Sequence, residues 1–165
     1  MQTEKITEKI VSWLKDYATI AGVNGYVVGV SGGVDSGVVS TLCAMTGLKV
    51  LVLEMPIRQK QDQVNRAQEH IDFLKNKFPN VEGGTVNLSP AFEELYKTLD
   101  VKDEEFPAEK LAFANTRARL RMLTLYYYGQ INGLLVCGTG NKVEDFGIGF
   151  YTKYGDGGVD VSPIA

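Results

Sequence analysis

Histidine and cysteine are scarce in this 165-residue chain, which has one histidine, His70, and two cysteines, Cys43 and Cys137. A single histidine disfavours both a Ser-His-Asp triad and a histidine-based metal centre. Neither cysteine belongs to a CxxC pair or has a neighbouring histidine, which disfavours a disulfide, a metal pair or a catalytic thiol. We expect two small buried apolar cysteines in a reducing cytoplasm. We expect His70 to be a solvated surface residue of a polar helix.

Neither an excess of basic residues nor a long apolar run is present. The chain has 17 Lys and Arg against 20 Asp and Glu, and its net charge is −3. Without a basic field, non-specific binding to nucleic acid or to a membrane surface is disfavoured, although a local basic pocket is still compatible with these numbers. No apolar run approaches the roughly 18–20 residues that span a bilayer, and the N-terminus lacks the apolar core of a signal peptide. We therefore expect one cytoplasmic globular domain over residues 1–165.

The apolar pattern alternates between helical and extended periods along the chain. Helices are expected at 3–20, 37–46, 61–77, 91–99 and 108–128, and strands at 26–30, 49–55, 84–88 and 134–138. Strand 49–55 is continuously apolar, which is typical of a parallel sheet that is covered on both faces. This order predicts an α/β fold, a doubly wound Rossmann-like parallel sheet with helices on both faces and right-handed crossovers. Ser89 is expected to cap the helix at 91–99, with Pro90 in its first turn.

The most informative stretch joins a predicted strand to a predicted helix and consists of Gly29, Val30, Ser31, Gly32, Gly33, Val34, Asp35 and Ser36. Backbone N–H groups at a helix start favour an anion, and glycines let the main chain approach phosphate oxygens. No Lys follows the glycines, as GxxxxGK[ST] would require, and Ser31 replaces the second glycine of GxGxxG. Asp35 would repel phosphate unless a divalent cation lay between them, so the loop predicts Mg²⁺.

Polar or flexible residues follow three predicted strands, at 31–36, 56–58 and 138–144. Ligands of parallel sheets bind beyond the carboxyl ends of the strands, so we expect these segments to converge on one crevice. Glu144 is then a candidate second metal ligand, with a solvated loop acid as the alternative. Thr139 is a candidate hydroxyl donor to a phosphate or a ribose. The segment 150–158, FYTKYGDGG, can hold a planar heterocycle beside an anionic group.

The motif SGGVDS resembles the pyrophosphatase loop of the ATP pyrophosphatase (adenine nucleotide alpha-hydrolase-like) superfamily. Together with NTRARLRM at 115–122, GTGNKVE at 138–144 and FYTKYGDGG at 150–158, it resembles the ammonia-dependent NAD synthetase family, in the same order and over essentially the whole chain. The resemblance implies that residues 29–36 and Thr139 contact ATP and that Asp35 and Glu144 hold Mg²⁺. It also assigns Arg119, Lys153 and Asp160 to deamido-NAD, with Arg58 approaching the nucleotide.

The activity that this resemblance implies is the ATP-dependent amidation of deamido-NAD to NAD by ammonia. An acyl adenylate forms with release of pyrophosphate, and ammonia then displaces AMP; no side chain is assigned as an acid–base catalyst. The family is homodimeric, and the helix at 108–128 is our candidate for part of the contact. Arginines at i and i+2 do not share a helix face, so at most one or two of Arg117, Arg119 and Arg121 reach the site. On resemblance we favour Arg119. Tyrosines 126–128 are expected in core or dimer packing.

The sequence also departs from the family pattern. One extra residue is expected between Glu144 and Lys153, and the family continues beyond residue 165, so we expect a C-terminally truncated chain. We expect no glutaminase segment before the first helix, so that ammonia would come from solution or from another chain. Two alternatives stay open: another enzyme with this loop, GMP synthetase-like or tRNA-modifying, and a nucleotide-binding module without catalysis. A tRNA- or purine-modifying enzyme should show a basic surface or metal-binding cysteines.

Overall fold

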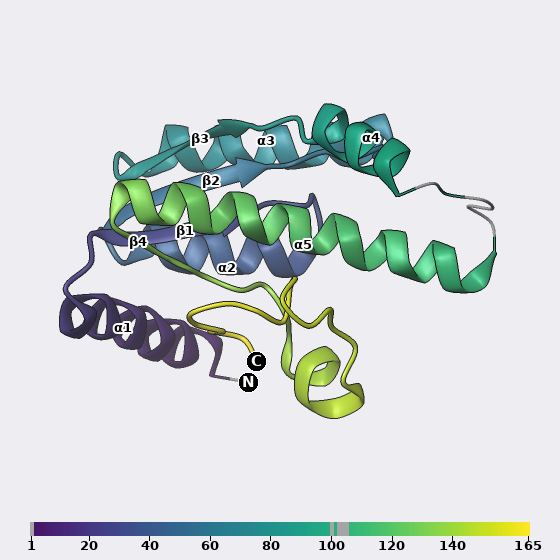
Figure 1. Ribbon diagram of the computed structural model, residues 1–165. Helices are drawn as coiled ribbons and strands as arrows, with labels where there is room; N and C mark the ends of the chain where they lie inside the picture. The colour runs from purple at the N-terminus through teal and green to yellow at the C-terminus, as the bar shows by residue number, and fades with distance from the viewer. Residues whose placement is uncertain (1, 100, 102–105) are drawn as a thin grey trace.

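Four parallel strands form the centre of the molecule, in the order β3-β2-β1-β4 (Figure 1). The computed structural model describes residues 2–99, 101 and 106–165. The strands are β1 (Gly25–Gly29), β2 (Lys49–Glu54), β3 (Val81–Thr85) and β4 (Leu134–Val136). Val27 of β1 pairs with Leu51 of β2 on one side and with Val136 of β4 on the other. The reversal of strand order at β1 is the place where a doubly wound sheet opens a crevice.

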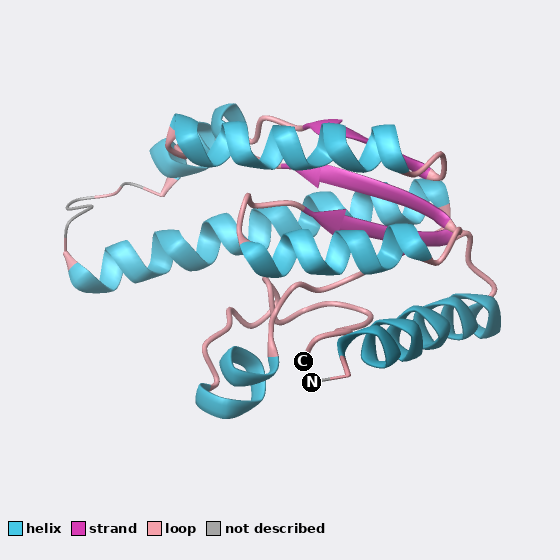
Figure 2. Cartoon of the chain, turned by 180° about the vertical axis from the view of Figure 1, so that it is seen from behind, coloured by secondary structure: helices cyan, strands magenta, loops and turns pink. Residues whose placement is uncertain are grey.

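Helices cover both faces of this sheet, as expected (Figures 1 and 2). One apolar cluster joins the sheet to α1 (Thr3–Ala21), α2 (Val34–Met45) and α3 (Gln61–Lys77). The other joins it to α4 (Ser89–Thr98) and α5 (Pro107–Asn132). Alternate residues of β2 supply the two clusters, Val50 and Val52 to the first and Leu53 to the second. This alternation follows from the two-residue period of a strand and confirms the α/β class. No helix of the described chain is long and apolar enough to span a bilayer.

Helix α2 begins earlier than the sequence pattern indicated. Its first residue is Val34 rather than Gly37, so Asp35 and Ser36 lie in the first helical turn. Ser36 is buried, and its Oγ accepts a hydrogen bond from the Ser31 N–H (3.2 Å) and donates one to the Gly33 carbonyl (3.0 Å). This local network continues the helix into a stretch whose glycine and serine content is typical of a loop.

Strand β3 and helix α4 also differ from expectation. The strand was predicted at 84–88 but lies at Val81–Thr85, because Gly83 packs against β2 so closely that a Cβ would lie 2.2 Å from the Val52 carbonyl oxygen. The predicted Ser89 cap is wrong: Ser89 is the first helical residue and Leu88 is the N-cap, without a side-chain hydrogen bond. Asn87 Oδ1 accepts from the Ser89 N–H instead (3.0 Å). Pro90 does lie in the first turn.

Cys43 and Cys137 are both buried and free, as predicted. Cys43 lies on α2 and Cys137 follows β4, and their Sγ atoms are 3.5 Å apart. The hydrogen bond to Cys43, together with burial, raises the pKa of the Cys137 thiol. The Cys137 thiol therefore stays protonated at neutral pH, and both cysteines act as packing groups between α2 and the sheet.

His70 is half-buried, so its predicted place on the solvated surface is wrong. Its Nε2 lies 2.9 Å from Ser40 Oγ on α2, and its ring stacks on Phe73 with centroids 6.1 Å apart. The ring also approaches Gly37, where an added Cβ would lie 3.8 Å from it, an ordinary van der Waals contact. The polar composition of α3 hid this contact, which depends on how closely α2 and α3 approach.

Burial lowers the pKa of His70 below its usual value of 6.5. A base with a lowered folded-state pKa gives stability that is complete above its unfolded pKa and is lost as the pH falls through the folded pKa. We expect the free energy of unfolding to decrease between about pH 7.5 and about pH 5.5, and to decrease less in His70→Gln. Urea unfolding at both pH values measures this. Equal pH dependence in the two proteins would contradict the lowered pKa of His70. Asp145, whose pKa is raised, affects the pH dependence of stability in the opposite direction, and it does so equally in both proteins.

Candidate functional site

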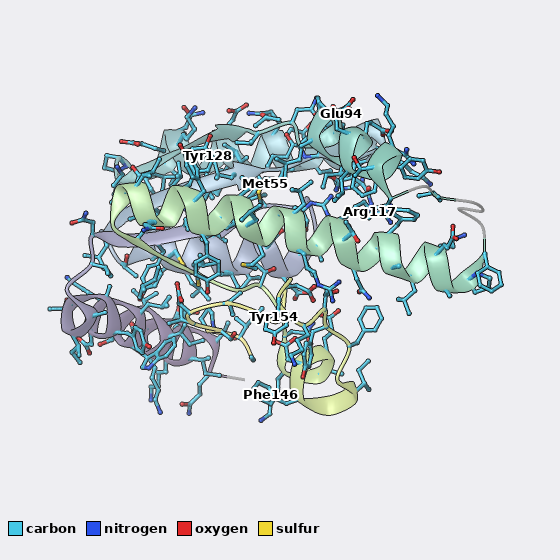
Figure 3. All side chains as sticks on the ribbon, in the orientation of Figure 1. Met55, Glu94, Arg117, Tyr128, Phe146 and Tyr154 are labelled. Atoms are coloured by element: carbon cyan, nitrogen blue, oxygen red, sulfur yellow. The ribbon has the colours of Figure 1, made fainter. Side chains whose placement is uncertain are left out.

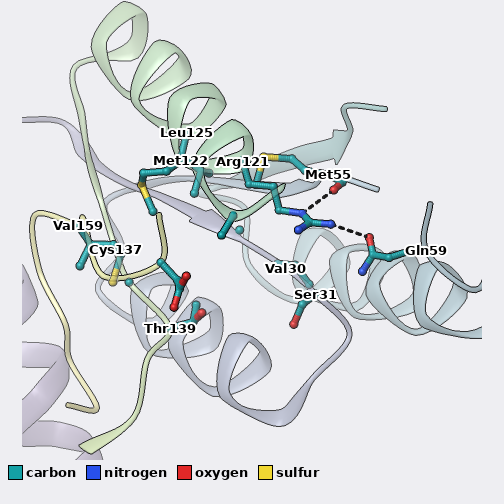
Figure 4. Close-up of a pocket in the computed structure, with 14 residues that line it drawn as sticks. Val30, Ser31, Met55, Gln59, Arg121, Met122, Leu125, Cys137, Thr139 and Val159 are labelled. Atoms are coloured by element: carbon teal, nitrogen blue, oxygen red, sulfur yellow. Dashed lines mark hydrogen bonds between the residues drawn. The ribbon is translucent and has the colours of Figure 1, made fainter. Parts of the chain in front are cut away.

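A cavity of about 290 Å³ opens at the carboxyl ends of β1, β2 and β4, beside α5 (Figure 4). It is lined by Gly29, Val30, Ser31, Met55, Gln59, Ala118, Arg121, Met122, Leu125, Cys137, Gly138, Thr139, Asp156 and Val159. The segments after three strands thus converge, as the sequence predicted. Most of the wall is apolar, while Ser31, Thr139 and Asp156 contribute hydroxyl and carboxylate groups. A small apolar cavity with a few polar groups is typical of a ligand site.

The glycine-rich loop closes one end of this cavity. Gly33 is the N-cap of α2, and no side chain caps that helix, so the amides of its first turn are available to an anion. Gly32 has a φ of +79°, and a Cβ there would lie 2.7 Å from the Gln63 carbonyl oxygen of α3. Only glycine combines this left-handed conformation with so close a helix contact. The loop is therefore held in place from behind by α3.

Asp35 and Glu144 come from opposite sides of the loop region and are joined through Asn141. The Asn141 Nδ2 group donates to Asp35 Oδ2 (3.3 Å), and its Oδ1 accepts from the N–H of Glu144 (3.1 Å). Both carboxylates are half-buried, and among the described residues neither forms an ion pair. Hard carboxylate oxygens beside a phosphate loop are the donor set that Mg²⁺ uses, with phosphate and water completing its shell. The residues present therefore fit the predicted cation.

Asn141 was not among the predicted site residues. It lies inside the GTGNKVE motif, which is the signal that could have identified it. Its Oδ1 also accepts from the N–H of Val143 (3.0 Å), so this one side chain starts the helix η1 (Val143–Ile148) and contacts Asp35.

The helix η1 has π geometry. A π-helical turn holds one more residue than an α-helical hydrogen-bonded turn, and such turns often occur at functional sites. This is where the extra residue before Lys153 was expected. Burial raises the pKa of Asp145 in this helix, and the neighbouring carboxylates Asp156 and Glu144 raise it further. Negative charge thus accumulates beside the loop, which favours a cation there.

The three arginines of α5 point in different directions, as their spacing predicts. Arg117 lies over the Phe92 ring on the α4 side of the helix, 5.9 Å from the centroid (Figure 3). Arg119 is exposed and its Nε donates to the Lys153 carbonyl (3.1 Å). Arg121 is the one that lines the cavity, where its Nε donates to the Met55 carbonyl (2.9 Å). The resemblance favoured Arg119, and no sequence signal distinguished Arg121.

Arg58 is turned away from the cavity. Its guanidinium donates twice to the Glu93 carboxylate (2.6 and 2.8 Å) and lies over the Tyr96 ring, 4.8 Å from the centroid. The hydrogen bond from Arg58 lowers the pKa of Glu93. Arg58 has a positive φ of 49°, an uncommon conformation for a non-glycine residue. The neighbouring Gln59 takes the position in the cavity wall.

Lys153 and Asp160 lie outside the cavity lining. Lys153 Nζ lies over the Tyr154 ring, 4.9 Å from the centroid. Asp160 holds the edge of the sheet: its Oδ2 accepts from the Val136 N–H (2.7 Å) and its Oδ1 from the Tyr126 hydroxyl (3.0 Å). Burial and this hydrogen bond raise the pKa of Tyr126 to about 12. Their assignment to deamido-NAD stays a prediction.

The loop, the cavity and the strand order define the class of protein, a doubly wound α/β protein with a glycine-rich loop after its first strand. The family model described as NAD synthase matches residues 6–165. An NH3-dependent NAD+ synthetase from Carboxydothermus hydrogenoformans is 41% identical over 162 residues, covering 98% of this chain and 64% of that protein. Its counterpart from Mesoplasma florum is 38% identical over 165 residues, covering 99% of this chain and 64% of that protein. The chain belongs to the NAD synthase family.

Solved structures agree with this assignment. A protein described as NMN synthetase, from Francisella tularensis, has a TM-score of 0.87 at 33% identity and covers 100% of this chain and 65% of that one. The NH3-dependent NAD synthetase from Campylobacter jejuni, in complex with the nitrate ion, has a TM-score of 0.86 at 30% identity, covering 100% and 68%. The expected fold family is thereby confirmed. This chain spans about 64% of the length of its first curated relatives.

Proposed function

We propose that this chain forms the ATP-binding part of an enzyme that converts deamido-NAD to NAD with ATP and ammonia. The observation that carries the proposal is the uncapped first turn of α2, which contains Asp35 and directly follows the loop residues that line the apolar cavity. Asn141 links the Asp35 carboxylate to the backbone of Glu144. The names of the relatives, NH3-dependent NAD+ synthetases, support the reaction. Because the relatives are longer than this chain, its own activity is measured directly in the experiment below.

The reaction needs an activated carboxyl group, because oxide is a poor leaving group. In the proposed sequence the nicotinate carboxylate of deamido-NAD attacks the α-phosphorus of ATP, and pyrophosphate leaves. Ammonia then attacks the acyl carbon of the adenylate, and AMP departs. Mg²⁺, when held by Asp35 and Glu144, would neutralise phosphate charge so that two anions can meet. The amides of the α2 first turn bind the departing pyrophosphate.

The remaining residues contribute position rather than acid–base chemistry. The apolar wall formed by Val30, Met55, Met122 and Leu125 suits a purine ring. Thr139 and Ser31 border the same cavity and offer hydroxyl groups to a phosphate or a ribose. Holding two substrates in reactive alignment supplies a large part of the rate enhancement in such a reaction. No general base among the described side chains is required, and the sole histidine is occupied with Ser40.

The proposal is tested by incubating the protein with deamido-NAD, ATP, Mg²⁺ and ammonium and measuring NAD, AMP and pyrophosphate. We expect all three products in equal amounts, and neither NAD nor AMP when the nitrogen donor is left out. ATP binding in calorimetry without NAD formation would instead support the nucleotide-binding module. Nicotinate mononucleotide, which carries the same carboxylate as deamido-NAD, is included as a second acceptor because the Francisella relative is described as an NMN synthetase. Absence of ATP binding would contradict the proposal altogether.

We also propose a homodimer that uses part of α5. Leu123, Tyr127 and Ile131 follow each other at four-residue spacing on one face of this helix and are 67%, 60% and 61% exposed. An apolar stripe of this kind is typical of an interaction surface. Sedimentation equilibrium measures the assembly state, and a monomer at all concentrations would contradict the proposal. A reducing cytoplasm, which the free cysteines suit, is the proposed location.

A further inference from the structure

Arg121 has an unusual environment for a structural arginine. It is half-buried on α5, and its Nε and Nη2 donate to the Met55 carbonyl (2.9 Å) and to Gln59 Oε1 (3.5 Å), both neutral acceptors (Figure 4). Among the described residues no carboxylate forms an ion pair with it. A guanidinium has five N–H donors in a rigid plane, so these two contacts leave donors at the cavity wall.

Two other arginines of this chain compensate their charge with a carboxylate. Arg58 makes a two-pronged contact with Glu93, and Arg66 pairs with Asp62 across one helical turn (3.2 Å). Arg121 is more buried than a surface arginine, and burial together with the charge of Arg117 lowers its pKa. A partly desolvated cation without an anion is unfavourable unless a ligand supplies the anion.

We propose that Arg121 binds an oxyanion of a bound substrate inside the cavity, either a phosphate group of the nucleotide or the carboxylate that is to be activated. Arg121 shares the cavity with Ser31 and Thr139, so an anion that binds at Ser31 would lie in the same cavity. The Nε bond to Met55 fixes the plane of the guanidinium, and a fixed planar fork binds an oxyanion through two parallel hydrogen bonds. The proposal rests on the proposed function: the phosphate alternative requires only its nucleotide binding, and the carboxylate alternative requires its reaction as well.

This role is separate from the one that resemblance assigns to Arg119. Arg119 is exposed, contacts the Lys153 carbonyl and does not line the cavity. The two side chains leave α5 two residues apart, about 200° around the helix. Arg119 therefore serves the outer segment at 150–158, and Arg121 serves the enclosed cavity.

Two pairs of probes, each differing in one anionic group, test the role of Arg121. AMP and adenosine differ by the phosphate, and deamido-NAD and NAD differ by carboxylate against carboxamide. Calorimetry on the full chain compares the wild type with Arg121→Met. We expect the affinity for the anionic member of one pair to fall roughly 10- to 100-fold, the range of a charge-assisted hydrogen bond. The neutral member should change much less, and the affected pair identifies which oxyanion Arg121 binds.

The matched control is Arg117→Met, which removes the same charge from the same helix one turn away and outside the cavity lining. An equal selective loss in this control, or equal losses for charged and neutral probes in Arg121→Met, overturns the proposal. Unchanged affinities in Arg121→Met, or a wild type that binds none of the four probes, also overturn it. Arg121→Gln keeps a donor for the Met55 carbonyl, so it gives the same test should the methionine variant not fold. NAD formation by the wild type is measured separately, and its absence would contradict only the proposed function.

Discussion

Asp35→Asn is expected to reduce ATP-dependent release of pyrophosphate by at least about 100-fold while leaving the fold intact. Asp35 lies in the first turn of α2, where the pyrophosphate would be bound, and its charge would let it share the proposed cation with Glu144. The amide is neutral and binds a divalent cation weakly, so the charge repulsion between the two substrates would be left unscreened. The asparagine carbonyl can still accept the hydrogen bond from Asn141 (3.3 Å in the wild type).

A matched control for this variant is Asp16→Asn, which makes the same chemical change on the exposed surface of α1. It should keep wild-type turnover and stability. Circular dichroism and the urea midpoint establish that Asp35→Asn is folded, and a coupled pyrophosphate assay measures the rate. A rate within a few-fold of the wild type would remove Asp35 from the proposed metal site.

Gly32→Ala is expected to lower both the stability of the protein and its affinity for ATP. The left-handed backbone of Gly32, φ +79°, costs an L-residue roughly 1–2 kcal/mol. The added Cβ would also lie 2.7 Å from the Gln63 carbonyl oxygen and 3.2 Å from the Ala67 nitrogen, both backbone atoms of α3. The loop must therefore move away from α3, which displaces the amides of the α2 first turn. We expect a loss of about 2–3 kcal/mol in unfolding free energy and at least a roughly tenfold weaker ATP affinity.

Gly47→Ala separates the two causes. Gly47 has nearly the same φ, +76°, but no atom lies within 4 Å of a Cβ built there. This control should therefore lose only the conformational contribution, roughly 1–2 kcal/mol, and should bind ATP as the wild type does. Urea unfolding and calorimetry with ATP measure both variants. If the two glycine variants behaved alike in stability and in ATP affinity, the close packing of the loop on α3 would not matter.

Local residue chemistry made much of the fold predictable. The α3 bounds, Gln61–Lys77, agree with the sequence prediction, because an amphipathic pattern ended by Pro79 marks the helix clearly. Strand β3 was misplaced because Gly83 and Gly84 have low strand propensity, and only the approach of β2 makes a glycine favourable there. His70 was misplaced for a related reason, since its partner Ser40 is thirty positions away on another helix.

The residues of the candidate site likewise fall into those that local sequence predicted and those that depend on contacts between distant segments. The phosphate loop, Thr139 and the convergence of three strand ends followed from motifs whose chemistry is carried by adjacent residues. Asn141 and Arg121 did not, because the first acts by connecting two segments, Asp35 and Glu144, that are distant in sequence. The second is chosen from three similar arginines only by the rotation at which α5 packs on the sheet.

The sequence by itself determined a parallel α/β sheet and a glycine-rich, aspartate-bearing phosphate loop, because apolar periodicity and special backbone residues act over a few positions. The tertiary structure alone decided which arginine enters the cavity, that Asn141 links the Asp35 carboxylate to the backbone of Glu144, and that α3 supports the loop at Gly32. These features depend on distances between elements, and such distances are set when the two faces of the sheet are packed by helices.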